Sequence, residues 1–334
     1  MKKAILLLFV AVAFCASCKK DQKKGPAVTG KTYKVNFDVS GFTQELINHS
    51  ANKPRTEGLE TNDTPPLSSA IANIYYYVFD SGGRLLHYLT QPSSATNFGN
   101  IADQLPAGSY TIVLAAGQDN LLVRNSSTGQ IAGTTTVELL RDLYLGGYYH
   151  FDPITTTETD LPWQDTFYKK IALTVTDSDI NQSVTMDRIV SQVTVDITDA
   201  IPANAHSITV TARTYRYFFL SSGDVTANPL PNNFTTSGVG PVDNLATTFI
   251  IPDAAKGTTD YKVSLLTLNN TDPSSVLINC YDASNNVLGS VKVDNVIMHP
   301  NTQTILSGNL FGTSNHFGVT LNGKWDPSTI NVPF

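Results

Sequence analysis

Alternation of apolar and polar residues dominates this chain and predicts β-strands. In residues 32–40, "TYKVNFDVS", a set of apolar side chains falls on one face: Tyr33, Val35, Phe37 and Val39. A period of two is the pattern of a half-buried strand. The same alternation returns in three later segments: 171–175, 193–197 and 208–212. No stretch has sustained helical periodicity, so the pattern predicts an all-β protein.

Turn residues divide the pattern into short strands. Residues 74–90, "IYYYVFDSGGRLLHYLT", predict a hairpin whose turn contains Asp80, Gly82 and Gly83, because glycine accepts the positive φ of tight turns. "DASNN" at 282–286 predicts a second hairpin turn. Further strands are expected near 261–268, 276–281, 287–293, 304–310 and 319–325. Short strands separated by turns at fairly regular spacing indicate β-sandwiches.

Several segments do not alternate and mark the organisation of the chain. Residues 135–151 mix periods and predict a strand or short helix before a turn at Gly146-Gly147. Long polar loops are expected at 41–68 and 221–246. The Thr-rich segment 154–163, "ITTTETDLPW", is the candidate domain boundary. The 334 residues are therefore expected to form two sandwich domains, residues 31–160 and 161–334.

The N-terminus has the order of a signal peptide. Lys2 and Lys3 precede an apolar run at 4–13, and small residues follow. This run is shorter than the ~20 residues of a membrane-spanning helix. Cys15-Ala16-Ser17-Cys18 resembles a bacterial lipobox, although the usual first residue is Leu. Residues 1–17 are thus expected to be removed and Cys18 to carry acyl chains; the alternative is an ordinary signal peptide with an incidental cysteine.

A polar tether is expected to follow Cys18. Residues 18–30 contain lysines, Gly25 and Pro26 but no apolar periodicity, which predicts disorder. About twelve extended residues reach roughly 40 Å. The folded part could therefore stand clear of an outer membrane to which acyl chains such as palmitate would fix it.

Cysteine usage and charge narrow the functional classes. Of three cysteines, only Cys280 lies in the predicted folded part, and its alternation with Val276 and Ile278 predicts a buried small hydrophobe. The whole chain has a net charge of −6. Loss of Lys2 and Lys3 leaves 20 basic residues against 28 acidic ones, which is −8. This balance argues against nucleic acid as a partner.

The sequence contains no motif for catalysis, a cofactor or a metal. The six histidines have no metal-ligand spacing, and there is no phosphate loop or nucleophile elbow. A pair of facing carboxylates, as in a glycosidase, depends on three-dimensional spacing and stays open at this point. Trp325 could be an exposed sugar-binding platform or a core residue of the last strand.

Four stretches in order resemble one family. "IYYYVFDSGGRLL" (74–86), "LPAGSYTIVLAAG" (105–117), "LRDLYLGGYYHF" (140–151) and "MDRIVSQVTVDI" (186–197) are similar to motifs of the fimbrillin-associated anchor lipoproteins of Gram-negative bacteria, the FimB type. The resemblance implies two transthyretin-like, Greek-key β-sandwich domains. It also implies a lipid-anchored, surface-exposed outer-membrane protein that anchors or caps a fimbrium by pairing strands with a fimbrial subunit, without enzymatic activity or cofactor.

The resemblance suggests two further sites. Related shaft subunits are cut after an arginine in an N-terminal loop, and Arg55 lies in such a loop here. A neighbour's strand then fills the groove, because a sheet edge with unpaired backbone groups accepts an extended segment. At the C-terminus, "STINVPF" alternates Ile330, Val332 and Phe334 and could be a donor strand, or equally its own domain's last strand. A rival function is a surface glycan-binding lipoprotein of a polysaccharide-uptake system.

Overall fold

The computed structural model describes residues 30–42, 68, 71–118, 121–126, 130–133, 137–146, 163–225, 242–269, 272–312 and 317–322. Over these ranges the chain forms eighteen β-strands and two 3-10 helices of three residues each. The expected all-β class is therefore confirmed.

The strands divide into two groups along the chain. The first group is β1 (Thr32–Phe42), β2 (Asn73–Asp80), β3 (Leu85–Pro92), β4 (Asn100–Pro106), β5 (Gly108–Gly117), β6 (Leu122–Asn125), β7 (Leu143–Gly146), β8 (Thr166–Val175) and β9 (Ile180–Arg188). The second group is β10 (Ser191–Ile197), β11 (Ala205–Tyr215), β12 (Tyr217–Phe219), β13 (Val242–Ile250), β14 (Tyr261–Thr267), β15 (Ser274–Asp282), β16 (Val287–Val296), β17 (Gln303–Gly308) and β18 (Phe317–Asn322). The 3-10 helices are Leu140–Asp142 and Asp253–Ala255.

The first sandwich is one seven-stranded sheet folded over on itself. Its strand order is β3-β2-β5-β8-β9-β1-β4. β8 and β9 are joined only through Phe167–Arg188 and Tyr168–Asp187, so the sheet bends between them. The layer β3-β2-β5-β8 then faces the layer β9-β1-β4, and inward side chains of both layers form a single apolar core.

The strand β1 shows why the alternation predicted this arrangement. Val35, Phe37 and Val39 are all at most 3% exposed, whereas Lys34 and Asp38 face outward. Each buried apolar side chain stabilises the fold by about 1.5–3 kcal/mol, so a shift by one residue would expose the entire apolar face. The predicted apolar face of β1 is confirmed.

A small third layer covers the outer face of β2, β5 and β8. It is the three-stranded sheet β12-β7-β6, in which β12 comes from a later part of the chain than β7. Tyr77, Val113 and Tyr168 pack beneath it in a second apolar core. The segment predicted as a strand or short helix near 140 is both, since the helix Leu140–Asp142 leads directly into β7.

The second sandwich consists of two four-stranded sheets. Their orders are β14-β10-β17-β18 and β13-β11-β15-β16. Val193, Val195 and Ile197 of β10 face Ile208 and Val210 of β11 within one apolar core. Two expected sandwich domains are thereby confirmed.

The two sandwiches share one topology. In each, the first strand lies between an antiparallel and a parallel neighbour: β1 between β4 and β9, and β10 between β14 and β17. The opposite layer, β3-β2-β5-β8, corresponds to β13-β11-β15-β16 in the same chain order. β6, β7 and β12 are insertions, and β18 has no counterpart in the first sandwich within the described residues.

The predicted boundary at 160/161 does not coincide with the division between the sheets. β8 and β9 follow that boundary, yet both pair within the seven-stranded sheet. The chain passes into the second sandwich at Ile189 and Val190, between β9 and β10. The motif at 186–197 therefore spans the passage between the sandwiches.

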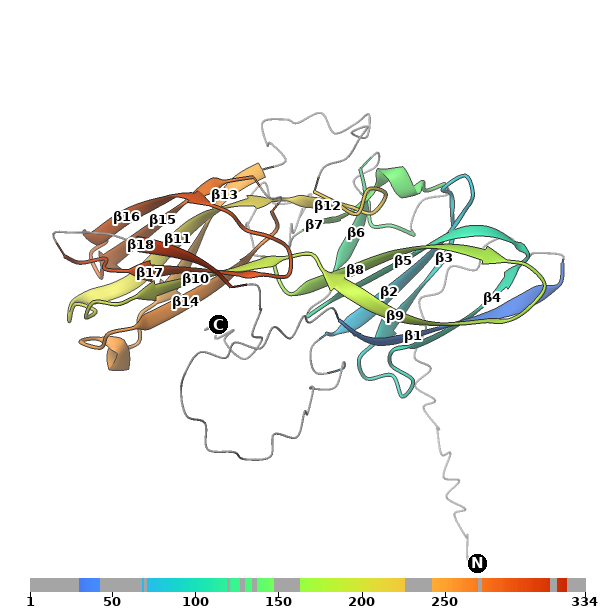
Figure 1. Cartoon of the computed structure of the whole chain (residues 1–334), viewed down its shortest axis with the longest axis horizontal. Helices are drawn as coiled ribbons and strands as arrows, with labels where there is room; N and C mark the ends of the chain where they lie inside the picture. Colours follow the sequence, from blue (N-terminus) through green and yellow to red (C-terminus); the bar gives the residue numbers. More distant parts are fainter. Residues whose placement is uncertain are drawn as a thin grey trace, which may run out of the picture.

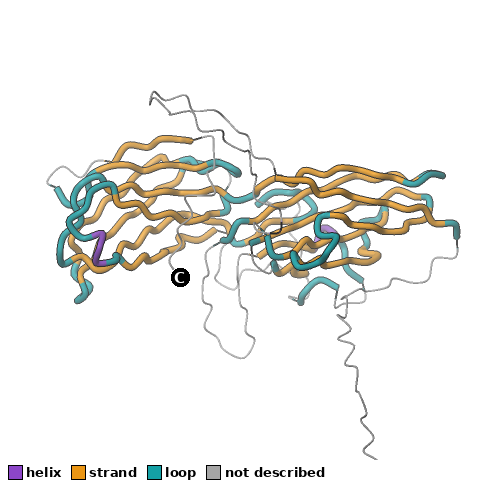
Figure 2. Tube along the Cα trace, turned by 90° about the horizontal axis from the view of Figure 1, so that it is seen from below, coloured by secondary structure: helices purple, strands orange, loops and turns teal. Residues whose placement is uncertain are grey.

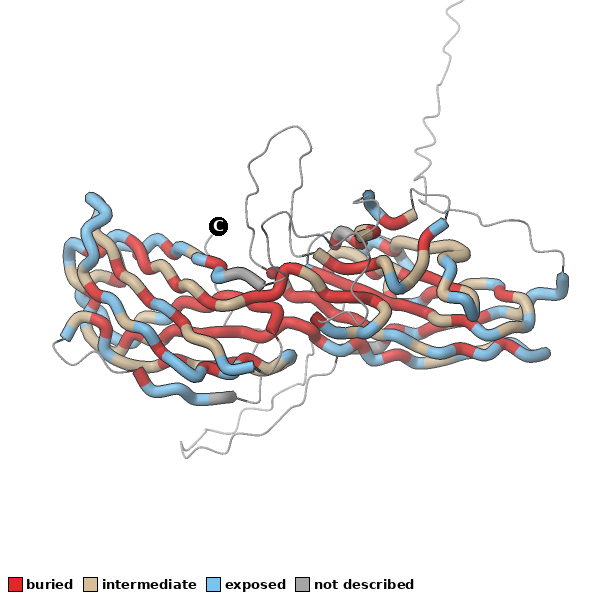
Figure 3. Tube along the Cα trace, turned by 90° about the horizontal axis from the view of Figure 1, so that it is seen from above, coloured by how far each residue is buried: buried red, intermediate tan, exposed pale blue. Residues whose placement is uncertain are grey.

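The sandwiches lie end to end along the longest axis of the molecule (Figure 1). Figure 2, turned by 90°, shows the strands of both halves running roughly along this axis. In Figure 3 the buried stretches continue from one half to the other. They meet in the second core, where Trp163, Tyr215 and Leu268 pack together.

Candidate functional site

The most unusual feature of the first sandwich is an opening between β8 and β9. We define the β8/β9 opening as the space between residues 170–175 of β8 and residues 180–185 of β9. Among the described residues, these parts of β8 and β9 pair only with β5 and β1, respectively. Figure 1 shows the two strands bowing apart. Half-buried Ile171 and Ile180 pack against the core at this opening.

The second sandwich has a strand at the corresponding position. By the shared topology, β9 corresponds to β17, and β17 carries the additional antiparallel strand β18 from Phe317 to Asn322. The side chain of Phe317 is 8% exposed and completes the core of that sandwich. By this comparison, the β8/β9 opening lies on the side of β9 that corresponds to the side of β17 where β18 pairs.

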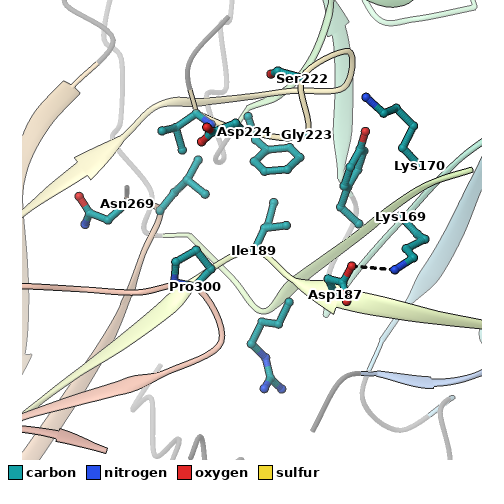
Figure 4. A pocket seen from close by; sticks show the side chains of 14 residues that line it. Lys169, Lys170, Asp187, Ile189, Ser222, Gly223, Asp224, Asn269 and Pro300 are labelled. Carbon is teal, nitrogen blue, oxygen red and sulfur yellow. Dashed lines mark hydrogen bonds and ion pairs between the residues drawn. The ribbon is translucent and has the colours of Figure 1, made fainter. Parts of the chain in front are cut away.

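A pocket adjoins the junction end of the opening. We call this cavity of about 360 Å³ the junction pocket. It is lined by apolar and polar side chains, among them Tyr168, Lys169, Ile189, Leu268 and Pro300. Figure 4 shows the ion pair between Lys169 and Asp187 on one side of the pocket and Asn269 on the other. Its volume lies within the usual range of ligand pockets.

A buried ion pair stands where β8 and β9 meet. The Arg188 guanidinium donates to both oxygens of Asp165, with Nε–Oδ1 2.7 Å and Nη2–Oδ2 2.9 Å. The same guanidinium lies 4.9 Å from the Phe167 ring centroid. Burial raises the pKa of the Asp165 carboxyl, and hydrogen bonds and charge from Arg188 oppose that rise.

The opposite margin of the first sandwich is closed by a polar clasp. Asp103 on β4 accepts a hydrogen bond from the Tyr76 hydroxyl of β2 at 2.9 Å, and His87 Nε2 of β3 lies 2.8 Å from the same oxygen. Burial raises the pKa of Asp103, but His87, the Gln104 N–H and Tyr76 outweigh it, so this pKa lies below the usual 3.8. The clasp ties the two layers together at this margin. In the described part of the chain, the β8/β9 opening has no comparable contact along residues 170–175.

We expect the substitution His87→Gln to make the protein more sensitive to acid. An acid with a lowered pKa in the folded state stabilises the fold above its unfolded pKa, and this contribution is lost as the pH falls through the folded pKa. Without His87 the pKa of Asp103 rises, so the loss begins at higher pH. The free energy of unfolding should fall by about 1.5 kcal/mol at neutral pH, as for a hydrogen bond to a charged group.

Thermal unfolding followed by circular dichroism measures how the unfolding midpoint changes with pH. A range of roughly pH 2 to 7 covers the titration of an ordinary carboxyl group. Tyr76→Phe is the comparison variant: it removes a smaller contribution to the lowered pKa of Asp103 and leaves His87 in place, so its acid limb should shift less than that of His87→Gln. An acid limb that coincides with that of the unsubstituted protein would contradict the role given to His87.

The remaining sequence expectations concern the buried cysteine, metal-binding or membrane-spanning segments, and sites that fall outside the described residues. Cys280 is 0% exposed, and burial raises the pKa of its thiol to about 11, which confirms the predicted buried hydrophobe. Within the described ranges, no cluster of three metal-ligating side chains occurs. Likewise, none of the described helices is long and apolar enough to cross a membrane. Cys18, Arg55, Ile330, Val332 and Phe334 lie outside the residues that the structure describes.

Comparison with known proteins identifies the family. The model of the family described as fimbrillin-A associated anchor proteins Mfa1 and Mfa2 matches residues 31–245, well over half of the chain. The chain belongs to this family. No curated protein is similar enough in sequence to count as a match.

Solved structures share the fold of this family member. A candidate polysaccharide-binding protein of Bacteroides thetaiotaomicron has 12% identity and a TM-score of 0.51, covering 89% of this chain and 99% of its own. A candidate adhesin of the same species has 10% identity and a TM-score of 0.51, covering 88% and 100%. The fimbrial anchor protein Mfa2 of Porphyromonas gingivalis has 12% identity and a TM-score of 0.44, covering 88% and 98%.

Membership of the Mfa1/Mfa2 family supports a fimbrial anchor or accessory role at the cell envelope, with a fimbrial subunit as partner.

The sequence indicated the family but did not predict β9 as a strand. Its alternation, seen at Val184 and Met186, is interrupted by the inward polar residue Gln182.

Proposed function

We propose that this protein is the lipid-anchored base or cap of a fimbrium and that the β8/β9 opening receives an extended segment of a fimbrial subunit. The anchor role rests on membership of the Mfa1/Mfa2 family. The pairing role rests on one observation: the topology of the second sandwich places β18 where the first sandwich has its opening. The action is mechanical and requires no catalysis.

The opening sets requirements for the incoming strand. Within the part of the chain that the structure describes, the margins of β8 and β9 have no strand partner at the opening, and their backbone groups supply hydrogen bonds to an extended segment. Side chains that alternate with a period of two would place apolar groups toward Ile171 and Ile180, as Phe317 does in the second sandwich. One end of the strand would reach the junction pocket, where Ile189, Leu268 and Pro300 offer apolar contacts.

Site-specific photocrosslinking in fimbriated cells tests the pairing. Benzoylphenylalanine in place of Ala172, an exposed residue of β8, should crosslink to a fimbrial subunit recovered from membranes. Ala246 is the matched control, because it is an exposed alanine on β13, a marginal strand of the second sandwich. We expect at least about tenfold more adduct from position 172, the ratio that 1.4 kcal/mol of preferential occupancy gives.

Equal yields from the two positions, or adducts from position 246 alone, would show that the subunit does not occupy the opening. Recovery of a porin-type transporter in place of a fimbrial subunit would favour the glycan-uptake alternative. Trp163 is buried, with its Nε1 donating to the Tyr215 carbonyl, and Trp325, the candidate sugar-binding platform, lies outside the described residues.

The anchor itself is proposed to be Cys18. Acyl chains contribute about 0.8 kcal/mol for each buried CH₂, so two or more chains hold a protein stably on a membrane. In the same fimbriated cells, Cys18→Ala should move the protein from the membrane fraction to the soluble fraction. Mass spectrometry should find the lipid only on the unsubstituted chain. Arg55 remains a predicted cleavage site and Ile330, Val332 and Phe334 a predicted donor strand.

A further inference from the structure

A polar depression lies on the outer face of the layer β4-β1-β9. This hollow of about 440 Å³, here called the amide depression, is lined mainly by short polar side chains: Asn36, Asp38, Asn97, Asn100, Asn181 and Ser183. Most of these side chains are exposed. The depression shares Asn181 and Ser183 of β9 with the β8/β9 opening, but it lies on the outer face of the layer, whereas the opening is bounded by the strand margins.

Two cross-strand rows form the floor of the depression. In the first row Asp38 lies between Asn100 on β4 and Ser183 on β9. In the second, Asn36 lies between Ala102 and Asn181. Neighbouring strands are about 4.8 Å apart. The first row therefore presents three polar groups at this spacing, and the second presents Asn36 and Asn181 with the small Ala102 beside them.

The second sandwich supplies an internal reference for these rows. Residues 35–39, "VNFDV", correspond by topology and pattern to residues 193–197, "VTVDI". Asp196, the counterpart of Asp38, lies between Lys262 on β14 and Ser307 on β17. Lys262 Nζ is 2.6 Å from Asp196 Oδ2, and the Ser307 hydroxyl lies 3.5 Å from the same oxygen.

The first sandwich retains the aspartate and the serine but replaces the lysine by Asn100. No described residue forms an ion pair or hydrogen bond with the Asp38 carboxylate. In the second row, the Thr194–Ser264 hydrogen bond of 2.8 Å closes the reference sheet, whereas Ala102 leaves space beside Asn36. The same two substitutions thus open the hollow and expose a carboxylate within it.

We propose that the amide depression binds a neutral saccharide through a pair of adjacent hydroxyl groups. The Asp38 carboxylate accepts hydrogen bonds from both hydroxyls, and such charge-assisted bonds are stronger than bonds between neutral groups. Asn36 Nδ2 donates to Asn181 Oδ1 at 2.8 Å, so the Asn36 oxygen is the acceptor and the Asn181 amide the donor that this pair offers to a ligand. The sugar ring occupies the space above Ala102.

The charge and donor set favour a saccharide over a calcium ion. Calcium takes six to eight oxygen ligands and usually several carboxylates, and Asp38 is the single carboxylate that lines the depression in the described residues. Amide and hydroxyl groups offer both hydrogen-bond donors and acceptors, and sugar hydroxyls use both. A cation binds only the acceptor oxygens.

Saturation-transfer NMR on the full chain in detergent micelles tests the proposal with three methyl pyranosides: α-mannoside, α-galactoside and α-glucoside. They differ in the orientation of neighbouring hydroxyls. We expect saturable binding of at least one, with a Kd on the order of 1 mM. Asn100→Lys, which copies the ion pair of the second sandwich, and Asp38→Asn should each weaken that binding at least about tenfold, because both remove the free carboxylate.

Gln104→Ala is the matched control, since Gln104 is exposed on the same strand β4 but does not line the depression. It should leave the Kd unchanged, and all three variants should keep the thermal unfolding midpoint of the parent. Absence of binding by all three glycosides would overturn the proposal. So would equal binding by Asn100→Lys and the parent, or calorimetry showing that the site takes calcium chloride and no glycoside.

Discussion

Replacing Arg188 by Leu should lower the free energy of unfolding by about 3–5 kcal/mol, because it leaves the Asp165 carboxylate buried without its partner. Arg188 is 4% exposed and Asp165 is 7% exposed. Without the guanidinium, only the hydrogen bond from the Thr166 backbone opposes the rise that burial causes in the pKa of Asp165. The carboxyl must then be protonated or drawn toward water, and both alternatives disturb the point where β8 and β9 meet.

Urea unfolding followed by circular dichroism measures this loss, and a double-mutant cycle separates its causes. Asp165→Leu combined with Arg188→Leu removes both charges and should recover most of the stability, since replacing a buried pair by apolar residues is often neutral. If the double variant is as unstable as Arg188→Leu, the pair is not the reason for the loss. Lys169→Met is the comparison for an exposed pair, and its effect should stay below about 1 kcal/mol.

Trp163→Ala should have the second large effect, a loss of about 3–5 kcal/mol that acts on the junction between the sandwiches. Trp163 is 5% exposed and lies in the core that also contains Tyr215 and Leu268 of the second sandwich. Its Nε1 donates to the Tyr215 carbonyl at 2.7 Å. The substitution therefore creates a cavity and leaves a buried acceptor without its donor.

Because that core joins the two halves, we expect Trp163→Ala to separate one unfolding transition into two. Differential scanning calorimetry resolves the transitions. Trp163→Phe keeps most of the ring volume and removes the hydrogen bond, so it should cost only about 1–2 kcal/mol and preserve the coupling. A single transition with an unchanged midpoint in Trp163→Ala would show that the sandwiches are coupled elsewhere.

Most strands of the fold were predictable because their side chains alternate sharply. β1, β10 and β11 each place apolar residues at every second position, and the structure buries them. The turn at Asp80 was also predictable from the sequence. The Asp80 carboxylate accepts hydrogen bonds from the N–H groups of Gly82 and Arg84, and Gly83 has a φ of 75°. Asp282 repeats this geometry with Ser284 and Asn286.

Other strands depended on their neighbours. Residues 221–246 were expected to form a loop, but β13 begins at Val242 and pairs along its whole length with β11. Its sequence, "VDNLATTFI", contains four polar residues, so the pattern alone is weak. β12 has only three residues and exists because β7 presents a free margin to it. Both β12 and β13 form because a neighbouring strand supplies their hydrogen bonds, and their amino-acid composition alone does not predict a strand.

The candidate sites were less predictable than the fold, because each one depends on residues brought together from different strands. The ion pair of Arg188 with Asp165 joins residues 23 positions apart. The row of Asn100, Asp38 and Ser183 draws one residue from each of three strands. No local spacing signals such a row.

The amino-acid sequence alone determined that this chain is made of strands, that it forms two sandwiches and that it resembles the fimbrial anchor family. These properties follow from local periodicity and from motifs a few residues long. Only the tertiary structure decided that β8 and β9 diverge, that β18 has no described counterpart in the first sandwich, and that Asp38 lacks the lysine that Asp196 has. The physical reason is that sheet order and cross-strand neighbours arise from hydrogen bonding and packing between segments far apart in the chain, which a period of two leaves open.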